Sequence, residues 1–114
     1  MSTQYDSVFN LQAAEDGLSL EKDIILALVR DFHSSKEQFL SPLRRGINAG
    51  DFMEIKGYSH KLKGAAYNLR IDGIGETAEA MEAAAAGEAL DSCINLLGVL
   101  EERFSSLEKD IYGT

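Results

Sequence analysis

The chain has 114 residues, of which 45% are hydrophobic and 26% are charged; this is the composition of an ordinary globular protein, and we predict a single domain spanning residues 1–114. The formal net charge of -8 disfavours nucleic acid or an anionic membrane as the main partner, and the single cysteine excludes an internal disulfide. No apolar run approaches the roughly 20 residues that span a bilayer, and the N-terminus lacks the pattern of a signal peptide, so we expect a cytoplasmic protein.

Apolar residues recur with helical spacing along most of the chain, whereas no segment alternates in the manner of a strand. A short helix is predicted over residues 8–15, ending at Gly17, and Ser19 is the expected N-cap of the next helix. The apolar stripe of that next helix is predicted to comprise Leu20, Ile24, Leu28 and Phe32, with Ile25 and Val29 beside them.

The helical pattern then resumes with a stripe that is interrupted by Pro42 and consists of Phe39, Leu40, Leu43 and Ile47. Proline has no backbone donor, so Pro42 either kinks one continuous helix or occupies the first position of a new helix capped by Ser41. The sequence leaves both possibilities open. Gly50 is expected to mark the end of this helical stretch.

Three further helices are predicted in the second half of the chain. Asp51 is the expected N-cap of the first, with Glu54 completing a capping box, and this helix is expected to run to about Leu69. A turn is expected at residues 72–73, and the helix after it should end at Gly87. The predicted stripes of the last two helices are Ile74, Ala78, Met81 and Ala85, and then Leu90, Cys93, Ile94, Leu97, Leu100, Phe104, Leu107 and Ile111.

Four substantial amphipathic helices are therefore joined by short turns, which favour antiparallel neighbours. We predict an all-α fold, an antiparallel up-down four-helix bundle with a short extra N-terminal helix. The polar composition favours a monomer.

His60 lies in the one basic stretch of an acidic chain. Residues 30–70 carry eight Lys or Arg against four acidic residues, whereas the stretches on either side are acidic. At about 100° per residue, His60 points away from the core stripe of its helix, which comprises Ile55, Tyr58, Leu62, Ala65, Ala66 and Leu69. We therefore expect His60 to face solvent, with outward neighbours Met53, Lys56, Gly57, Lys63, Gly64 and Tyr67.

Two glycines flank this histidine on the outward face. Gly57 and Gly64 lie one turn before and one turn after His60, although a glycine inside a helix costs about 1 kcal/mol relative to alanine. Removing side chains on both sides of an imidazole lets a bulky partner approach it. Lys63, one turn from His60, can reach a phosphoryl group on the imidazole Nε2 and neutralise its charge.

Residues 59–69, SHKLKGAAYNL, resemble the signature of the histidine-containing phosphotransfer (HPt) domain family: a histidine, a variable residue, Leu-Lys-Gly, small residues and an apolar position. The resemblance covers about residues 20–110. Residues 49–51 resemble the Gly-Asp start of the family's active helix, and Ile74 and the pair at residues 81–82 match its apolar and apolar-acidic positions. The chain departs from the family at Arg70 and Ile71, where small residues are usual, and this departure bears on partner choice more than on chemistry.

The resemblance implies a phosphoryl carrier in a two-component multistep phosphorelay. His60 would accept a phosphoryl group from a receiver-domain aspartate and pass it to another receiver. Lys63 would stabilise the phosphoryl group, Gly64 would admit the receiver, and Glu82 would accept a hydrogen bond from the imidazole Nδ1–H. The partner-binding surface would comprise Met53, Lys56, Gly57, Lys61, Tyr67 and Arg70.

The sequence has no GxxxxGK[ST] loop or other nucleotide-binding motif, so we expect a phosphotransfer intermediate and not an ATP-dependent kinase. No cofactor and no metal site of its own is expected, because Mg²⁺ would come with the partner receiver. The expected partners are the receiver domains of a hybrid histidine kinase and of a response regulator. The domain is either free-standing, which Met1 favours, or part of a larger hybrid kinase.

Two other classes of protein were weighed. A helical bundle that binds response regulators without carrying phosphate is the main alternative, although a degenerate relative would most easily lose the histidine. A metal-binding four-helix bundle needs a Glu three residues before a histidine, and Arg30 and Gly57 occupy those positions before His33 and His60. We therefore expect His33 to be an ordinary helix residue.

Overall fold

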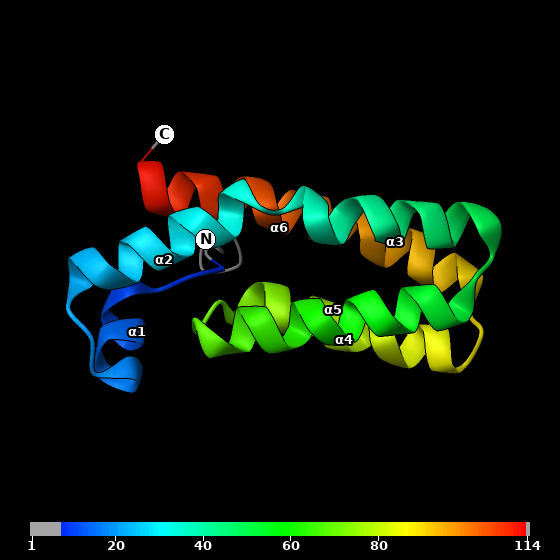
Figure 1. Ribbon diagram of the computed structural model, residues 1–114, viewed down its shortest axis with the longest axis horizontal. Helices are drawn as coiled ribbons and strands as arrows, with labels where there is room; N and C mark the ends of the chain where they lie inside the picture. Colours follow the sequence, from blue (N-terminus) through cyan, green and yellow to red (C-terminus); the bar gives the residue numbers. More distant parts are fainter. Residues whose placement is uncertain (1–7, 114) are drawn as a thin grey trace, which may run out of the picture.

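A computed structural model describes residues 8–113, and this part of the chain is built from helices without a strand. The helices are α1 (Leu11–Leu18), α2 (Lys22–Ser34), α3 (Glu37–Ala49), α4 (Phe52–Asn68), α5 (Asp72–Ala86) and α6 (Leu90–Tyr112). In Figure 1, α2 and α3 follow one another along one side, and the chain reverses before each of α4, α5 and α6. The predicted all-α bundle is confirmed. None of the helices described has the length and apolar character needed to cross a membrane.

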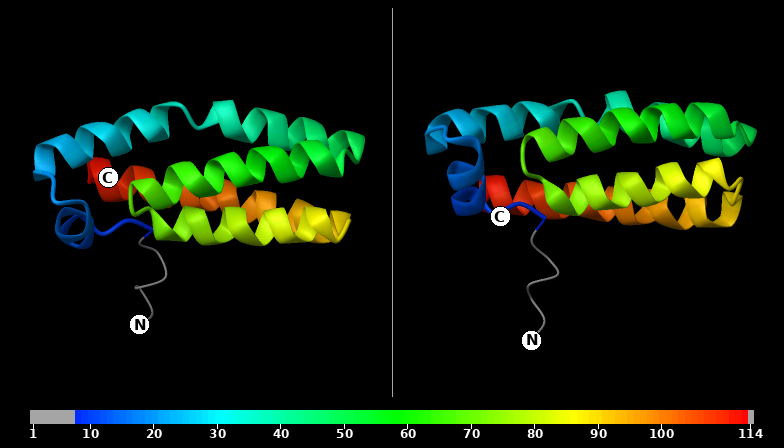
Figure 2. Two further views of the ribbon diagram at one scale, coloured as in Figure 1. Left: turned by 60° about the horizontal axis from the view of Figure 1, so that its bottom comes forward. Right: turned by 90° about the horizontal axis from the view of Figure 1, so that it is seen from below.

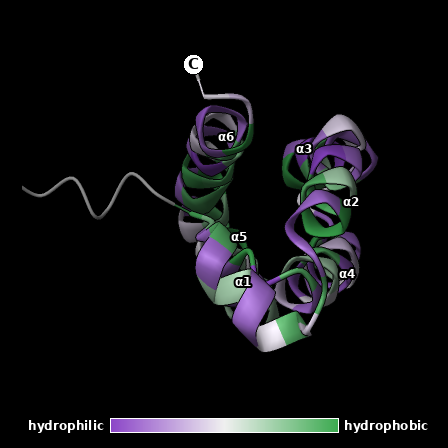
Figure 3. Ribbon diagram, turned by 90° about the vertical axis from the view of Figure 1, so that its left-hand side faces the viewer, coloured by the Kyte–Doolittle hydropathy of each residue, from purple (hydrophilic) through white to green (hydrophobic). Residues whose placement is uncertain are grey.

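The core forms where the apolar faces of the helices meet. Helix α4 packs mainly on α5 and also on α3, while α6 packs on α5, α3 and α2. Figure 2 shows α4 and α5 side by side in both views, and the end-on view of Figure 3 shows α5 and α6 facing α2, α3 and α4 across the interior. The largest fully buried side chains include Phe104, Ile25, Leu43, Ile55, Leu62, Met81 and Leu100. Each such side chain contributes about 1.5–3 kcal/mol through burial.

The interruption of the first long helical stretch lies before Pro42, so Pro42 neither breaks a helix nor occupies the first position of one. Helix α3 runs through Pro42, and the break falls at residues 35–36. Ser41 does not cap a helix: its hydroxyl donates to the Glu37 carboxylate at 3.1 Å. Pro42 removes one hydrogen bond of α3 and crowds the carbonyl one turn earlier, and the helix nevertheless continues through this buried residue.

The N-terminal helix boundaries also differ from the prediction. Asn10 caps α1, its side chain accepting a hydrogen bond from the Ala13 amide at 3.0 Å, and the helix continues past Gly17 to Leu18. Ser19 is not the N-cap of α2; it ends α1 in the left-handed conformation, with φ 56°.

Helix α2 is also rotated about its axis relative to the prediction. Ile25, Val29 and Phe32 are buried as expected, but Leu20, Ile24 and Leu28 are exposed instead of forming the centre of the inward stripe. His33 takes the remaining inward position. The choice between two adjacent apolar rows, each with helical spacing, depends on which neighbours α2 meets, and this information lies outside its own sequence.

The second half of the chain follows the prediction more closely. Asp51 caps α4 by accepting from the Glu54 amide at 3.1 Å, but Glu54 does not complete the capping box because its carboxylate pairs with Arg45. The expected turn at residues 72–73 is wrong: both residues belong to α5, and the turn lies at residues 69–71. The predicted stripe of α5 is buried throughout, and so is that of α6 except for Leu90 and Leu97, which are half-buried, and Ile94, which is exposed.

Candidate functional site

Helix α4 presents two chemically different faces. Its buried positions are Ile55, Ser59, Leu62 and Ala66. The His60 side chain points the other way and is 66% exposed, which is the outward position that the helical spacing predicts. The imidazole is thus attached to a helix whose opposite face is fixed in the core.

Glu82 holds the His60 ring from the neighbouring helix α5. Its Oε2 lies 2.9 Å from His60 Nδ1. A hydrogen bond from the Lys63 ammonium is the main cause that lowers the pKa of Glu82, and the bond to His60 adds to it. Near neutral pH, Glu82 is therefore ionised and can only accept, so Nδ1 carries the proton. The lone pair of the neutral ring then lies on Nε2, on the side of the ring away from Glu82.

Lys63 binds the second oxygen of the same carboxylate. Its Nζ lies 2.8 Å from Glu82 Oε1, and this hydrogen bond raises the pKa of Lys63. His60 and Lys63, one turn apart on α4, thus converge on a single acidic side chain of α5. The sequence predicted that Lys63 and Glu82 would each lie near His60, but not that Glu82 would bind Lys63.

Two positions beside His60, Gly57 and Gly64, have no side chain and face open space. A Cβ atom added at Gly57 or at Gly64 would meet no neighbouring atom within 4 Å. Both glycines are exposed, so neither serves close packing of helices. Side chains are therefore missing from the helical turns on both sides of the imidazole, where a large partner would have to approach.

Tyr67 extends the polar row one turn beyond Lys63. Its hydroxyl donates to Glu79 Oε1 at 3.0 Å, and burial, followed by this hydrogen bond, raises the pKa of Tyr67 to about 12. The ring lies against Gly75, where an added Cβ would come within 2.6 Å of a ring carbon. Sequence reasoning missed Gly75 and Glu79, although a glycine inside the predicted helix was the available signal for Gly75.

The other residues predicted to bind a partner are spread along α4. Met53 and Lys56 are exposed in its first turns, and Lys61 lies over the Tyr58 ring with Nζ 4.8 Å from the centroid. Arg70 is directed elsewhere, because its guanidinium donates to the Gly17 carbonyl of α1 at 3.4 Å.

The backbone at Arg70 has a conformation that favours glycine. Its φ of 62° is in the left-handed region, which glycine adopts without strain and a larger residue adopts at a cost of about 1–2 kcal/mol. Ile71, the other departure noted above, is fully buried. These two residues therefore act on the turn between α4 and α5 and on the core beneath it.

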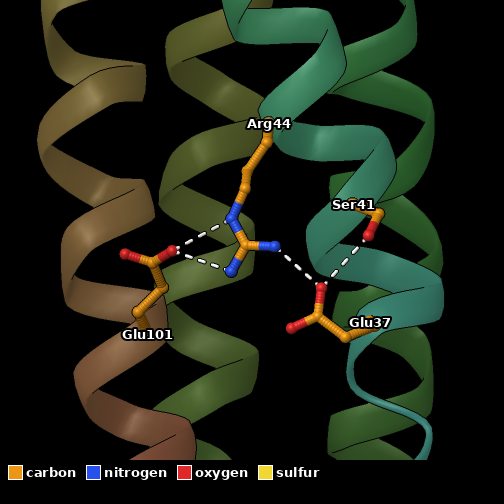
Figure 4. Close-up of polar contacts among 4 residues, drawn as sticks. All are labelled: Glu37, Ser41, Arg44 and Glu101. Atoms are coloured by element: carbon orange, nitrogen blue, oxygen red, sulfur yellow. Dashed lines mark hydrogen bonds and ion pairs between the residues drawn. The ribbon is translucent and has the colours of Figure 1, made fainter.

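A second polar cluster lies between α3 and α6. The Arg44 guanidinium binds Glu37 at 2.7 Å and Glu101 at 2.9 Å, and Ser41 donates to Glu37 (Figure 4). Beside it is an open groove of about 210 Å³, which His33 also lines. His33 is buried, packs near Phe104, and has a pKa lowered by that burial.

Comparison with known families gives one match. The sequence model of the family described as Hpt domain matches residues 27–110. That range contains His60, Lys63 and Glu82, together with the helices that hold them. No curated protein and no solved structure matches the chain.

Proposed function

Because the chain belongs to the Hpt domain family, whose members carry out histidine phosphotransfer in phosphorelays, we propose that His60 is the phosphoryl carrier. His60 accepts the group from a receiver-domain aspartate and passes it to another receiver. The observation that carries this proposal is the placement of the ring: Nδ1 is bound to Glu82, whereas the side chain as a whole is exposed between two glycines.

The transfer is a displacement at phosphorus. The Nε2 lone pair of His60 forms the new N–P bond while the P–O bond to the receiver aspartate breaks, and the bonding electrons leave with the aspartate carboxylate. The proton on Nδ1 stays in its hydrogen bond to Glu82, which stabilises the positive charge that develops on the ring. Such a reaction requires in-line positioning and charge neutralisation more than acid–base groups.

The surroundings of His60 supply these two requirements. Lys63 provides a flexible positive charge one turn from the imidazole, and the missing side chains at Gly57 and Gly64 let the receiver bring its phosphoaspartate into line. The receiver would cover the exposed residues of α4 at Met53, Lys56 and Lys61. We propose that Tyr67 borders this contact and that Arg70 affects it indirectly, through the turn and α1.

The remaining parts of the proposal follow from the sequence. We propose that Mg²⁺ is held by the receiver, that the donor is a phosphoprotein and not ATP, and that the domain acts as a monomer between a hybrid kinase and a response regulator. For the framework, we propose that α2 and α3 together, α4, α5 and α6 form the up-down four-helix bundle on which the site is built.

Phosphoryl transfer from a panel of labelled, phosphorylated receivers tests the proposal. Wild type is compared with His60→Gln, in which His33 remains as the second histidine. We expect acid-labile, alkali-stable label on wild type and none on His60→Gln. Label retained by His60→Gln would overturn the assignment. Absence of label on wild type from every receiver, with native circular dichroism, would favour a module that binds regulators without carrying phosphate.

A further inference from the structure

We infer that Glu82 and the phosphoryl group compete for Lys63, so that Glu82 limits how strongly phosphate is held on His60. This inference rests on the proposed function. In the structure, Lys63 is already bound: its Nζ lies 2.8 Å from Glu82 Oε1. The cation assigned to the phosphoryl group is therefore occupied while His60 carries no phosphate.

The geometry makes this competition direct. Both oxygens of Glu82 are engaged, Oε2 by His60 Nδ1 and Oε1 by Lys63 Nζ. A phosphoryl group on Nε2 adds negative charge one helical turn from Lys63, within reach of its four-carbon side chain. The ammonium must then leave Glu82 or be shared with it. Glu82 keeps its hydrogen bond to Nδ1 in either case, so the ring stays oriented while the cation moves.

A neighbouring carboxylate helps to separate this effect from general electrostatics. Glu79 lies one turn before Glu82 on α5 and also raises the pKa of Lys63, but its hydrogen bond is to Tyr67. It therefore acts on Lys63 through its charge, without the short contact that Glu82 makes. Removing the charge at Glu79 is a matched control for removing it at Glu82.

Glutamine is the informative replacement at position 82. Its amide oxygen can still accept from His60 Nδ1–H, but its NH₂ group cannot hold an ammonium. Glu82→Gln thus frees Lys63 for the phosphoryl group. It also removes the negative charge that stabilises the positive charge on the ring. This loss by itself disfavours the phosphorylated form. The two effects have opposite signs, so a single variant does not separate them.

A double-mutant cycle separates the two effects. The equilibrium distribution of phosphoryl between one receiver and His60 is measured for wild type, Glu82→Gln, Lys63→Met and the double variant. Glu82→Gln should shift the distribution towards phosphorylated His60 more when Lys63 is present than in the Lys63→Met background. From the usual strength of an exposed ion pair, we expect the two shifts to differ by about two- to fivefold. Glu79→Gln should give a much smaller difference.

Equal shifts in both backgrounds would overturn the inference, because Glu82 would then act on the ring alone. An equal effect of Glu79→Gln would also overturn it, because the short contact would not matter. Failure of the proposed function is distinguishable from these results, since His60 would then carry no label in any of the variants.

Discussion

Within residues 8–113, two of the charged contacts between helices form clusters, each centred on one side chain with two partners. Arg44 binds Glu37 of its own helix and Glu101 of α6 (Figure 4). Glu82 of α5 binds His60 and Lys63 of α4. In the Arg44 cluster, the Ser41 hydroxyl adds a further bond to Glu37. In the Glu82 cluster, the imidazole uses Nδ1 for the carboxylate and leaves Nε2 for another atom.

Under the proposed function, this difference distinguishes a structural cluster from a reactive one. Both clusters have short distances and shifted pKa values, so neither criterion identifies the functional site. The Glu82 cluster differs because it orients a nucleophilic nitrogen, and because the flanking glycines leave space around that nitrogen. The proposed function therefore rests on access to His60 Nε2 and on the free lone pair of this nitrogen.

The largest effect is expected from closing that space. Gly64→Arg places a long side chain beside His60 and should slow transfer from a receiver by more than about tenfold, because it clashes with the partner. Gly98→Arg, on α6, is the matched control, since an added Cβ there also meets nothing within 4 Å. Both variants should fold, as measured by circular dichroism. Equal transfer rates for the two variants would contradict the approach argument.

Removing one cation from each cluster, Lys63 or Arg44, should affect different properties. Lys63→Met should slow phosphorylation or shorten the lifetime of phosphorylated His60 by several-fold, because the phosphoryl charge loses its nearby cation. Arg44→Met should leave transfer unchanged and lower the free energy of unfolding by at most about 1 kcal/mol, since Arg44 is partly exposed. Transfer assays and urea unfolding measure both variants. A transfer defect in Arg44→Met would contradict the separate roles of the two clusters.

The carboxyl groups of the two clusters should also titrate independently of one another. The pKa of Glu82 is lowered in the folded protein, so its contribution to stability is complete above the ordinary value of 4.5 and is lost as pH falls through the lowered pKa. Lys63→Met should move the pKa of Glu82 upwards, whereas Arg44→Met should move the pKa of Glu37 upwards and leave that of Glu82 unchanged. Titration followed by ¹³C NMR of the carboxyl groups measures both. A shift of Glu82 in Arg44→Met would mean that the clusters are coupled.

The smallest effect is expected beside His60 but on the buried face. Ser59 Oγ is buried and has no hydrogen-bond partner in the structure, so Ser59→Ala removes an unsatisfied polar group. We expect stability to stay equal or to rise by up to about 1 kcal/mol in thermal unfolding, with transfer to His60 unchanged. A marked loss of stability would show that this hydroxyl is bonded in solution.

Much of the fold could be predicted from local signals. The Asp51 cap and the end of α3 at Gly50 depend on interactions within a few residues, and both were predicted. Helical spacing also predicted the buried stripe of α5. The rotation of α2 was not, because Ile24 and Ile25 both lie on apolar rows and only the packing against other helices chooses between them. The break before Pro42 could not be predicted, because residues 35–36 carry no strong helix breaker.

The residues of the site that lie on α4 could be predicted from the sequence. Those on α5 could be predicted only in part. His60, Lys63 and the two glycines share one helix, so helical spacing alone places them on the outward face. The partners on α5 depend on how two helices are aligned. Glu82 was found through a resemblance, and Glu79 was not found because nothing local pairs it with Tyr67.

The most direct test of the account is to identify the phosphorylated atom. The protein, with ¹⁵N-labelled histidine, is phosphorylated by a phosphorylated receiver, and the coupling of ³¹P to ring nitrogen is measured by NMR at alkaline pH. The account predicts coupling to Nε2 of His60, because Glu82 occupies Nδ1. Coupling to Nδ1, or phosphorus on any residue other than His60, would contradict it.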